Sequence, residues 1–153
     1  MSEYKLTQNI IALSNSKVWD SAKLEWRLIE VYEADEPETC LCGHFPIIEV
    51  CVLGNVYNHQ HATVGNCCVK KFIGLPSDKI FQSVKRVRKD NTKALNAEAL
   101  KHAHDKGWIN DWEYNFGIDT MRKRKLSDKQ IQTRIKINEK MMFNMKKLSS
   151  KGV

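Results

Sequence analysis

Four of the five cysteines fall into two close groups, a residue type and spacing that suit a metal ion. Cys40 and Cys42 form one group, and Cys67 and Cys68 form the other. Thiolates are soft ligands that hold zinc in a tetrahedral shell without any redox chemistry. An odd cysteine count in a chain without a recognisable signal peptide argues against a disulfide framework and for a reducing, cytoplasmic compartment. We therefore expect a structural Zn²⁺ site that uses Cys40, Cys42 and Cys68.

The fourth ligand of this site is open between His44 and Cys67. Adjacent residues seldom reach the same tetrahedral ion together, which is unfavourable for Cys67 beside Cys68. His44 completes a Cys-x-Cys-x-His cluster and keeps the ligands close in sequence. We expect His44 to be the fourth ligand. Cys51 lies within an expected strand and is interpreted as a small apolar core residue.

The elements around the cysteines predict a treble-clef-like arrangement. A Cys-x-Cys-Gly turn precedes two β-branched stretches, residues 47–53 and 59–64, which turn residues separate and which we expect to pair as a β-hairpin. A short helix over residues 67–73 should follow. The N-terminus of a helix stabilises a thiolate through its free N–H groups and its dipole, so Cys68 is well placed as a ligand.

Two segments around the cysteines carry a family resemblance. They are residues 40–47, Cys-Leu-Cys-Gly-His-Phe-Pro-Ile, and residues 64–72, Val-Gly-Asn-Cys-Cys-Val-Lys-Lys-Phe. This region resembles small zinc-finger-like modules of uncharacterised phage and bacterial proteins, with a CxCGH start and a VGxxC-then-KF end. The resemblance covers roughly residues 38–73. It implies metal binding by the matching positions Cys40, Cys42 and Cys68. The position of Cys67 varies in that pattern, which favours His44 as the fourth ligand. The resemblance implies no activity.

The rest of the chain has helical periodicity. Apolar spacing and capping residues predict helices over residues 5–13, 17–33, 78–89, 93–106, 111–122 and 128–148. The expected fold is therefore α+β and mainly helical, with a zinc-bound hairpin and helix packed among several α-helices. Its parts are an acidic helical segment (1–39), the zinc-binding module (40–75) and a basic helical region (76–153), which we expect to form one compact domain.

Charge is distributed unevenly along the chain. Residues 1–39 carry a net charge of −4, whereas residues 70–153 carry +12. A basic half of this kind attracts polyanions, and nucleic acid is the commonest polyanion inside cells. The expected contacts to the phosphate backbone come from basic residues beside the metal helix and in two dense clusters: Lys70, Lys71, Lys85, Arg86, Arg88, Lys89, Arg122, Lys123, Arg124 and Lys125. Composition does not distinguish DNA from RNA.

Two other functions compete with a zinc-stabilised, non-catalytic nucleic-acid-binding protein. The charge asymmetry also suits a phage-like protein-interaction module, or a regulator that binds a host protein. An enzyme would need an activated Cys67 or Cys68 with His59 or His61 as base, but the zinc site explains the same residues better. Phosphate-loop, dinucleotide and His-Glu-x-x-His motifs do not occur, so we expect no catalysis. No apolar run approaches the roughly 20 residues of a membrane-spanning helix.

Overall fold

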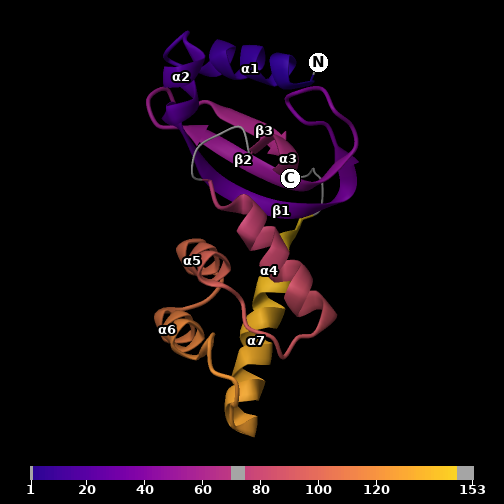
Figure 1. Cartoon of the computed structure of the whole chain (residues 1–153), viewed down its shortest axis with the longest axis vertical. Helices are drawn as coiled ribbons and strands as arrows, with labels where there is room; N and C mark the ends of the chain where they lie inside the picture. Colours follow the sequence, from indigo (N-terminus) through magenta and orange to yellow (C-terminus); the bar gives the residue numbers. More distant parts are fainter. Residues whose placement is uncertain (1, 70–74, 148–153) are drawn as a thin grey trace. The chain divides into compact units, whose positions relative to one another are not determined.

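The computed structural model, which describes residues 2–69 and 75–147, has an α+β fold (Figure 1). The chain divides into two compact units. Unit 1 comprises residues 1–77 and 146–153, and unit 2 comprises residues 78–145. The boundary lies two residues beyond the expected start of the basic region, and Lys146 and Lys147 belong to unit 1.

Unit 1 is built on a mixed sheet with the strand order β3-β2-β1-β4. The strands are β1 (Trp26–Glu38), β2 (Ile47–Asn55), β3 (His61–Gly65) and the two-residue β4 (Lys146–Lys147). β1, β2 and β3 pair in antiparallel fashion, and β4 adds to β1 in parallel. Cys51 on β2 lies between Val31 on β1 and Val64 on β3 in this register. The hairpin expected over residues 47–64 is therefore confirmed.

The expected helix over residues 17–33 is wrong for most of its length. Two short helices, α2 (Trp19–Ala22) and the 3-10 helix η1 (Lys23–Glu25), give way to strand β1 at Trp26. The stretch that follows is rich in β-branched and aromatic residues, including Ile29, Val31 and Tyr32, which suit a pleated surface. Pairing with β2 decides the outcome, because it satisfies the backbone of β1 and buries Trp26 and Val31. A bulge between Leu28 and Glu30 interrupts strict alternation and hides the strand pattern in the sequence.

Buried polar contacts connect α1 (Ser2–Leu13) and the segment after it to the sheet. The indole Nε1 of Trp26 donates to Ser14 Oγ at 2.9 Å. The Glu25 carboxylate accepts hydrogen bonds from the backbone N–H groups of Asn15 and Ser16 and from Asn55 Nδ2, each at 2.8 Å. These contacts join residues 14–16 to the start of β1 and, through Glu25, to the end of β2.

Unit 2 is helical, and its helices begin at clear capping residues. It contains α4 (Ser77–Lys89) from Asp78 onward, because Ser77 belongs to unit 1. The other helices of unit 2 are α5 (Ala97–Asp105), α6 (Asp111–Thr120) and α7 (Asp128–Met145). Asn96 caps α5, and Asn110 and Glu113 form a capping box at α6. The capping box expected from Ser127 and Gln130 is confirmed by reciprocal hydrogen bonds of 2.9 and 3.1 Å. α5 starts four residues later than expected because Asn96 turns the chain there.

The buried faces of the unit 2 helices follow helical spacing. Ile80, Val84 and Val87 of α4 are buried, as the sequence predicts. On α7 the apolar spacing predicts a buried stripe through Ile131, Ile135, Met142 and Met145. Of these only Met145 is buried and the other three are half-buried, while Ile137, Asn138 and Met141 are buried instead. Asn138 is tolerated there because its amide donates to the carbonyl oxygens of Asn91 and Lys93 at 2.8 Å. In the described part of the chain, no helix has the length and apolar character needed to cross a bilayer.

Candidate metal centre

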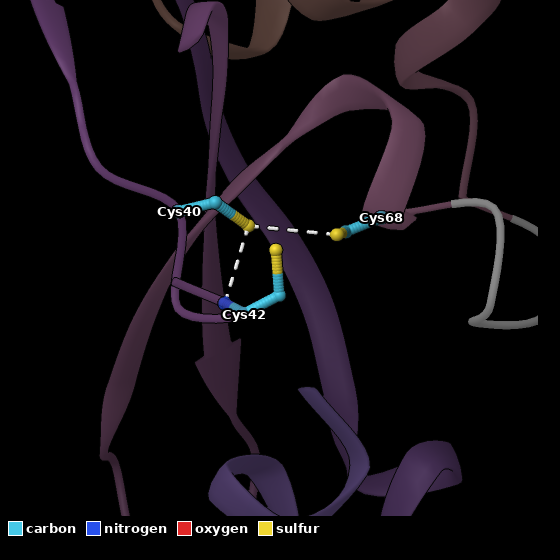
Figure 2. Close-up of side chains that lie close together, drawn as sticks. All are labelled: Cys40, Cys42 and Cys68. Atoms are coloured by element: carbon cyan, nitrogen blue, oxygen red, sulfur yellow. Dashed lines mark hydrogen bonds between the residues drawn. The ribbon is translucent and has the colours of Figure 1, made fainter. Parts of the chain in front are cut away.

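The sulfur atoms of Cys40, Cys42 and Cys68 converge in unit 1 (Figure 2). All three lie within 4.8 Å of one another, and the sulfurs of Cys40 and Cys68 are 3.5 Å apart. Cys40 and Cys42 are buried, and Cys68 is half-buried. The structure therefore brings together three cysteines that are separated by as many as 28 positions in the sequence.

A tight turn aims the first two cysteines at this point. The Gly43 N–H donates to the Cys40 carbonyl at 2.8 Å, and the Cys40 N–H donates to the His44 carbonyl at 2.9 Å. Gly43 has a φ of +94°, a left-handed conformation that a residue with a β-carbon rarely adopts. The turn leaves the Cys42 N–H 3.4 Å from Cys40 Sγ and the His44 N–H 3.4 Å from Cys42 Sγ. Backbone donors therefore face both sulfurs, as thiolates require.

Neighbouring elements fix the turn against the hairpin and the third cysteine. The Leu41 N–H donates to the Thr63 carbonyl on β3 at 3.0 Å. The Gly65 N–H, at the end of β3, donates to Cys40 Sγ at 3.3 Å. Asn9 Nδ2 of α1 donates to the Leu41 carbonyl at 2.8 Å. The chain then enters α3 (Asn66–Val69), whose third residue is Cys68. The short helix expected from residue 67 thus begins as predicted, and residues 70–73 lie outside the described residues.

Hydrogen bonding strongly favours a thiolate at Cys40. The hydrogen bond with Cys68 is the largest cause that lowers the pKa of Cys40, whereas burial raises this pKa. Hydrogen bonds from the N–H groups of Cys42 and Gly65 lower it further, and the resulting pKa is about 5. The same bond with Cys40 is the main reason that the pKa of Cys68 is raised, with burial adding to the effect. A cation bound by both sulfurs would displace the proton of this hydrogen bond.

The donor set fits zinc. With a Zn–S distance of about 2.3 Å, two sulfurs in a tetrahedral shell lie about 3.8 Å apart. The sulfur atoms of Cys40 and Cys68 are 3.5 Å apart, and all three sulfur atoms lie within 4.8 Å of one another, a range that includes this value. Three thiolates need one further ligand to complete the shell of a structural site. The three residues can thus hold a soft divalent cation.

His44 and Cys67 both line a shallow pocket of about 500 Å³ beside the three sulfurs. Both side chains are exposed, and neither joins the close group of ligand atoms found among the described residues. Pro46, Ile47, Ile48 and Glu49 also line this pocket. The identity of the fourth ligand remains a prediction.

Cys51 lies apart from the metal group, in the centre of the sheet. Its side chain is fully buried. Burial is the main cause that raises the pKa of the Cys51 thiol to about 12, although a hydrogen bond with Ser77 lowers it slightly. Cys51 is therefore a neutral thiol at physiological pH, which agrees with its interpretation as a core residue.

The two dense basic clusters of unit 2 lie on α4 and in the loop between α6 and α7. The side chains of both clusters are exposed. The clusters are Lys85, Arg86, Arg88 and Lys89 on α4, and Arg122, Lys123, Arg124 and Lys125 in the loop. Arg86 and Arg122 line one groove of about 580 Å³ together with the residues that begin α5. Lys70 and Lys71 lie outside the described residues. The structure thus brings one member of each cluster to the same groove, although they are far apart in sequence.

Other residues of the site have weak signals in the sequence. The N–H donors of Gly65 and Cys42 belong to the backbone, so they cannot be predicted from residue type. Asn9 resembles any polar residue of an amphipathic helix. His59 and His61, the candidate catalytic bases, are exposed and are not among the described residues that line the pocket beside the cysteines.

Comparison with models of protein families, with curated proteins and with solved structures finds no match to this chain.

Proposed function

We propose that the chain is a zinc-stabilised protein that binds nucleic acid through unit 2 and does no chemistry on it. Zinc would hold unit 1 in a treble-clef-like arrangement, with Cys40 and Cys42 on the turn and Cys68 on α3. The metal's role would be structural, because it would join the turn that carries Cys40 and Cys42 to the helix that carries Cys68.

The distribution of charge between the units carries the nucleic-acid part of the proposal. Unit 2 contains sixteen Lys and Arg residues against nine Asp and Glu residues, a net charge of +7. The whole chain also has a net charge of +7, so unit 1 is formally neutral. A compact basic unit beside a neutral one is the electrostatic pattern expected of a phosphate-binding surface.

The groove shared by Arg86 and Arg122 supports this surface. Neither arginine has an acidic partner within residues 2–69 and 75–147, whereas Glu98 at the edge of the groove is paired with Lys79 at 3.6 Å. Burial and the nearby charge of Arg86 lower the pKa of Arg134, whose guanidinium donates to the Thr120 carbonyl at 2.7 Å. Concentrated positive charge of this kind is relieved by a bound polyanion.

A salt titration of the full-length protein tests the proposal. Binding to short single- and double-stranded DNA and RNA is measured by fluorescence anisotropy. The expected affinity falls with salt, with a slope of about −0.7 to −0.9 per phosphate neutralised. The double variant Arg86→Gln and Arg122→Gln should make that slope shallower, by the amount expected for the loss of up to roughly two phosphate contacts.

The matched control is the double variant Lys101→Gln and Lys140→Gln. It removes the same charge from unit 2, but these lysines are paired with Asp105 at 2.8 Å and Glu113 at 2.6 Å. Equal losses in both variants would mean that diffuse charge, and not the arginine groove, makes the contacts. If the native protein binds none of the four nucleic acids at low salt, the proposed function is wrong.

A protein-binding role for unit 1 is the second candidate. Phe45 and Ile48 are exposed, by 60% and 45%, beside the pocket of the metal centre. Exposed apolar side chains of this size near a rigid turn are typical of contact surfaces for other proteins. A native protein that binds zinc but no nucleic acid would favour this protein-binding role of unit 1.

A further inference from the structure

An exposed aromatic pair on α6 is left unexplained by the fold. The rings of Trp112 and Phe116 are stacked, with centroids 5.4 Å apart and an interplanar angle of 18°. Phe116 is half-buried, whereas the Trp112 side chain is 62% exposed. A large aromatic side chain gains most from burial, so an open indole held flat by a neighbouring ring is unusual for a residue with only a packing role.

This aromatic pair forms one wall of a groove of about 640 Å³. The opposite wall comes from the first turns of α7 and is polar. It contains Ser127, Lys129, Gln130 and Thr133. The groove therefore combines a flat apolar surface with hydrogen-bonding groups on the facing side.

The polar wall keeps donors available to a ligand. The Gln130 side chain uses its Oε1 to accept from the Ser127 N–H at 2.9 Å, which leaves its Nε2 group as a donor. Lys129 has no acidic partner in the described part of unit 2 and offers an ammonium group. A flat ligand with acceptor atoms on its edge would satisfy both walls.

A basic loop continues directly into this wall. Arg122, Lys123, Arg124 and Lys125 are exposed and end two residues before Ser127. Because consecutive Cα atoms are 3.8 Å apart, the Lys125 backbone lies within about 8 Å of the groove. A phosphate group next to a bound base would thus lie near the cationic side chains of this loop.

We propose that the groove between Trp112 and the start of α7 binds an unpaired nucleobase, so that unit 2 recognises single-stranded nucleic acid. This inference rests on the proposed function and specifies its ligand. Stacking needs access to the face of a base, and in a duplex neighbouring base pairs cover both faces. Stacking on an aromatic side chain is tolerant of sequence, since every base has a π-face. The positive charge around the groove favours a polyanionic strand over a cationic or apolar peptide.

The test compares a single strand with the duplex of the same sequence, using full-length native protein and the variants Trp112→Ala and Trp112→Phe. Loss of one stacked base costs about 1–3 kcal/mol, so Trp112→Ala should weaken single-strand binding about 5- to 150-fold. Trp112→Phe keeps a flat ring and should retain most of the affinity. Duplex binding should be weaker than single-strand binding in the native protein and unchanged in both variants.

Phe143→Ala provides the control for loss of an exposed aromatic side chain, because Phe143 on α7 is 78% exposed and does not line the groove. It should leave single-strand affinity unchanged. Because Trp112 is exposed, thermal unfolding of Trp112→Ala should match that of the native protein, which separates a loss of binding from a loss of fold.

The possible results separate the two proposals. If Trp112→Ala leaves single-strand affinity unchanged while the Arg86 and Arg122 double variant weakens it, the base-binding site is wrong and the nucleic-acid function stands. Native protein that binds duplex as tightly as single strand also overturns the base-binding site. If native protein binds neither form at low salt, both proposals are wrong.

Discussion

The backbone N–H of Gly65 donates a 3.3 Å hydrogen bond to the sulfur of Cys40, 25 residues earlier in the chain. Gly65 is the last residue of β3 and precedes the helix that carries Cys68. One contact therefore links the turn, the end of the hairpin and the third cysteine. Because the donor is a backbone group, the register of β2 and β3 determines the position of the metal centre, and any slip of the hairpin would move it.

Replacement of Glu25 by Gln should destabilise unit 1 by about 1–3 kcal/mol, because a buried carboxylate that accepts three hydrogen bonds would be lost. Glu25 is only 4% exposed. Glutamine would replace one of the two carboxylate oxygens with an NH2 donor, which would face either the Ser16 N–H or the Asn15 N–H and Asn55 Nδ2. Chemical denaturation measures the change. Glu36→Gln, on the exposed part of β1, is the matched control and should change stability by less than about 0.5 kcal/mol.

The cost of Glu25→Gln should depend on pH. Burial alone would raise the pKa of Glu25, but hydrogen bonds from Asn55, Ser16 and Asn15 outweigh it, so the pKa in the folded state lies below the ordinary value of 4.5. The stabilisation from the ionised carboxylate is complete above pH 4.5 and is lost as the pH falls through the lower folded-state pKa. The stability difference between Glu25→Gln and the native protein should therefore shrink below about pH 4.5. A difference that stays constant down to acid denaturation would contradict this role.

Glu25 also shows where sequence reasoning failed. Helical spacing over residues 17–33 places the buried Trp26 on an apolar face with Val18, Ala22 and Ile29. Glu25, seven residues after Val18, falls on that same face although it is charged. The chain instead becomes a strand at Trp26 because it pairs with β2, and Asn55, 30 residues after Glu25, donates to the buried carboxylate. A contact at that distance leaves no periodic signal. The hairpin and the capped helices, whose patterns are local, could be predicted.

Gly117→Ala should destabilise unit 2, although alanine normally favours a helix over glycine. A β-carbon at position 117 would lie 2.7 Å from Leu100 Cδ2, and Leu100 is buried between α5 and α6. Overpacking costs about 1–3 kcal/mol, which outweighs the roughly 1 kcal/mol gained in helix propensity. Thermal unfolding checks the sign.

A double-mutant cycle with Leu100→Ala identifies the cause. If the clash with Leu100 is responsible, Gly117→Ala should become neutral or stabilising in the Leu100→Ala background, because the leucine methyl groups are gone. A cost that persists unchanged in that background would rule out the packing explanation.

The fourth metal ligand can be assigned by comparing His44→Gln with Cys67→Ser. We predict that His44→Gln lowers zinc affinity at least about 10- to 100-fold, since even loss of a residue that only supports a ligand costs that much. Cys67→Ser should have little effect. Spectroscopy of the cobalt-substituted protein distinguishes three thiolates plus one imidazole from four thiolates. A large effect of Cys67→Ser with none from His44→Gln would assign Cys67 instead.

The three cysteines could be selected from their spacing and from the elements around them, because a turn, a hairpin and a helix start are each recognisable locally. The sequence could not place the fourth ligand, since the orientations of His44 and Cys67 depend on how the turn packs against β3 and α1. The i,i+4 spacing of Trp108 and Trp112 favours a core contact, although exposed rings at these positions could stack on unpaired bases. In the structure Trp108 packs against His102, and Trp112 stacks on Phe116 at the surface.

The metal content of the reduced, full-length protein and of Cys42→Ser tests the central claim most directly, with Cys51→Ala as a cysteine control outside the metal group. We predict one zinc per native chain and per Cys51→Ala chain, and none in Cys42→Ser. The thermal unfolding temperature of Cys42→Ser should fall steeply, because metal binding and folding of unit 1 are coupled. A native protein without zinc, or a Cys42→Ser variant with unchanged zinc content and unfolding temperature, would contradict the metal centre.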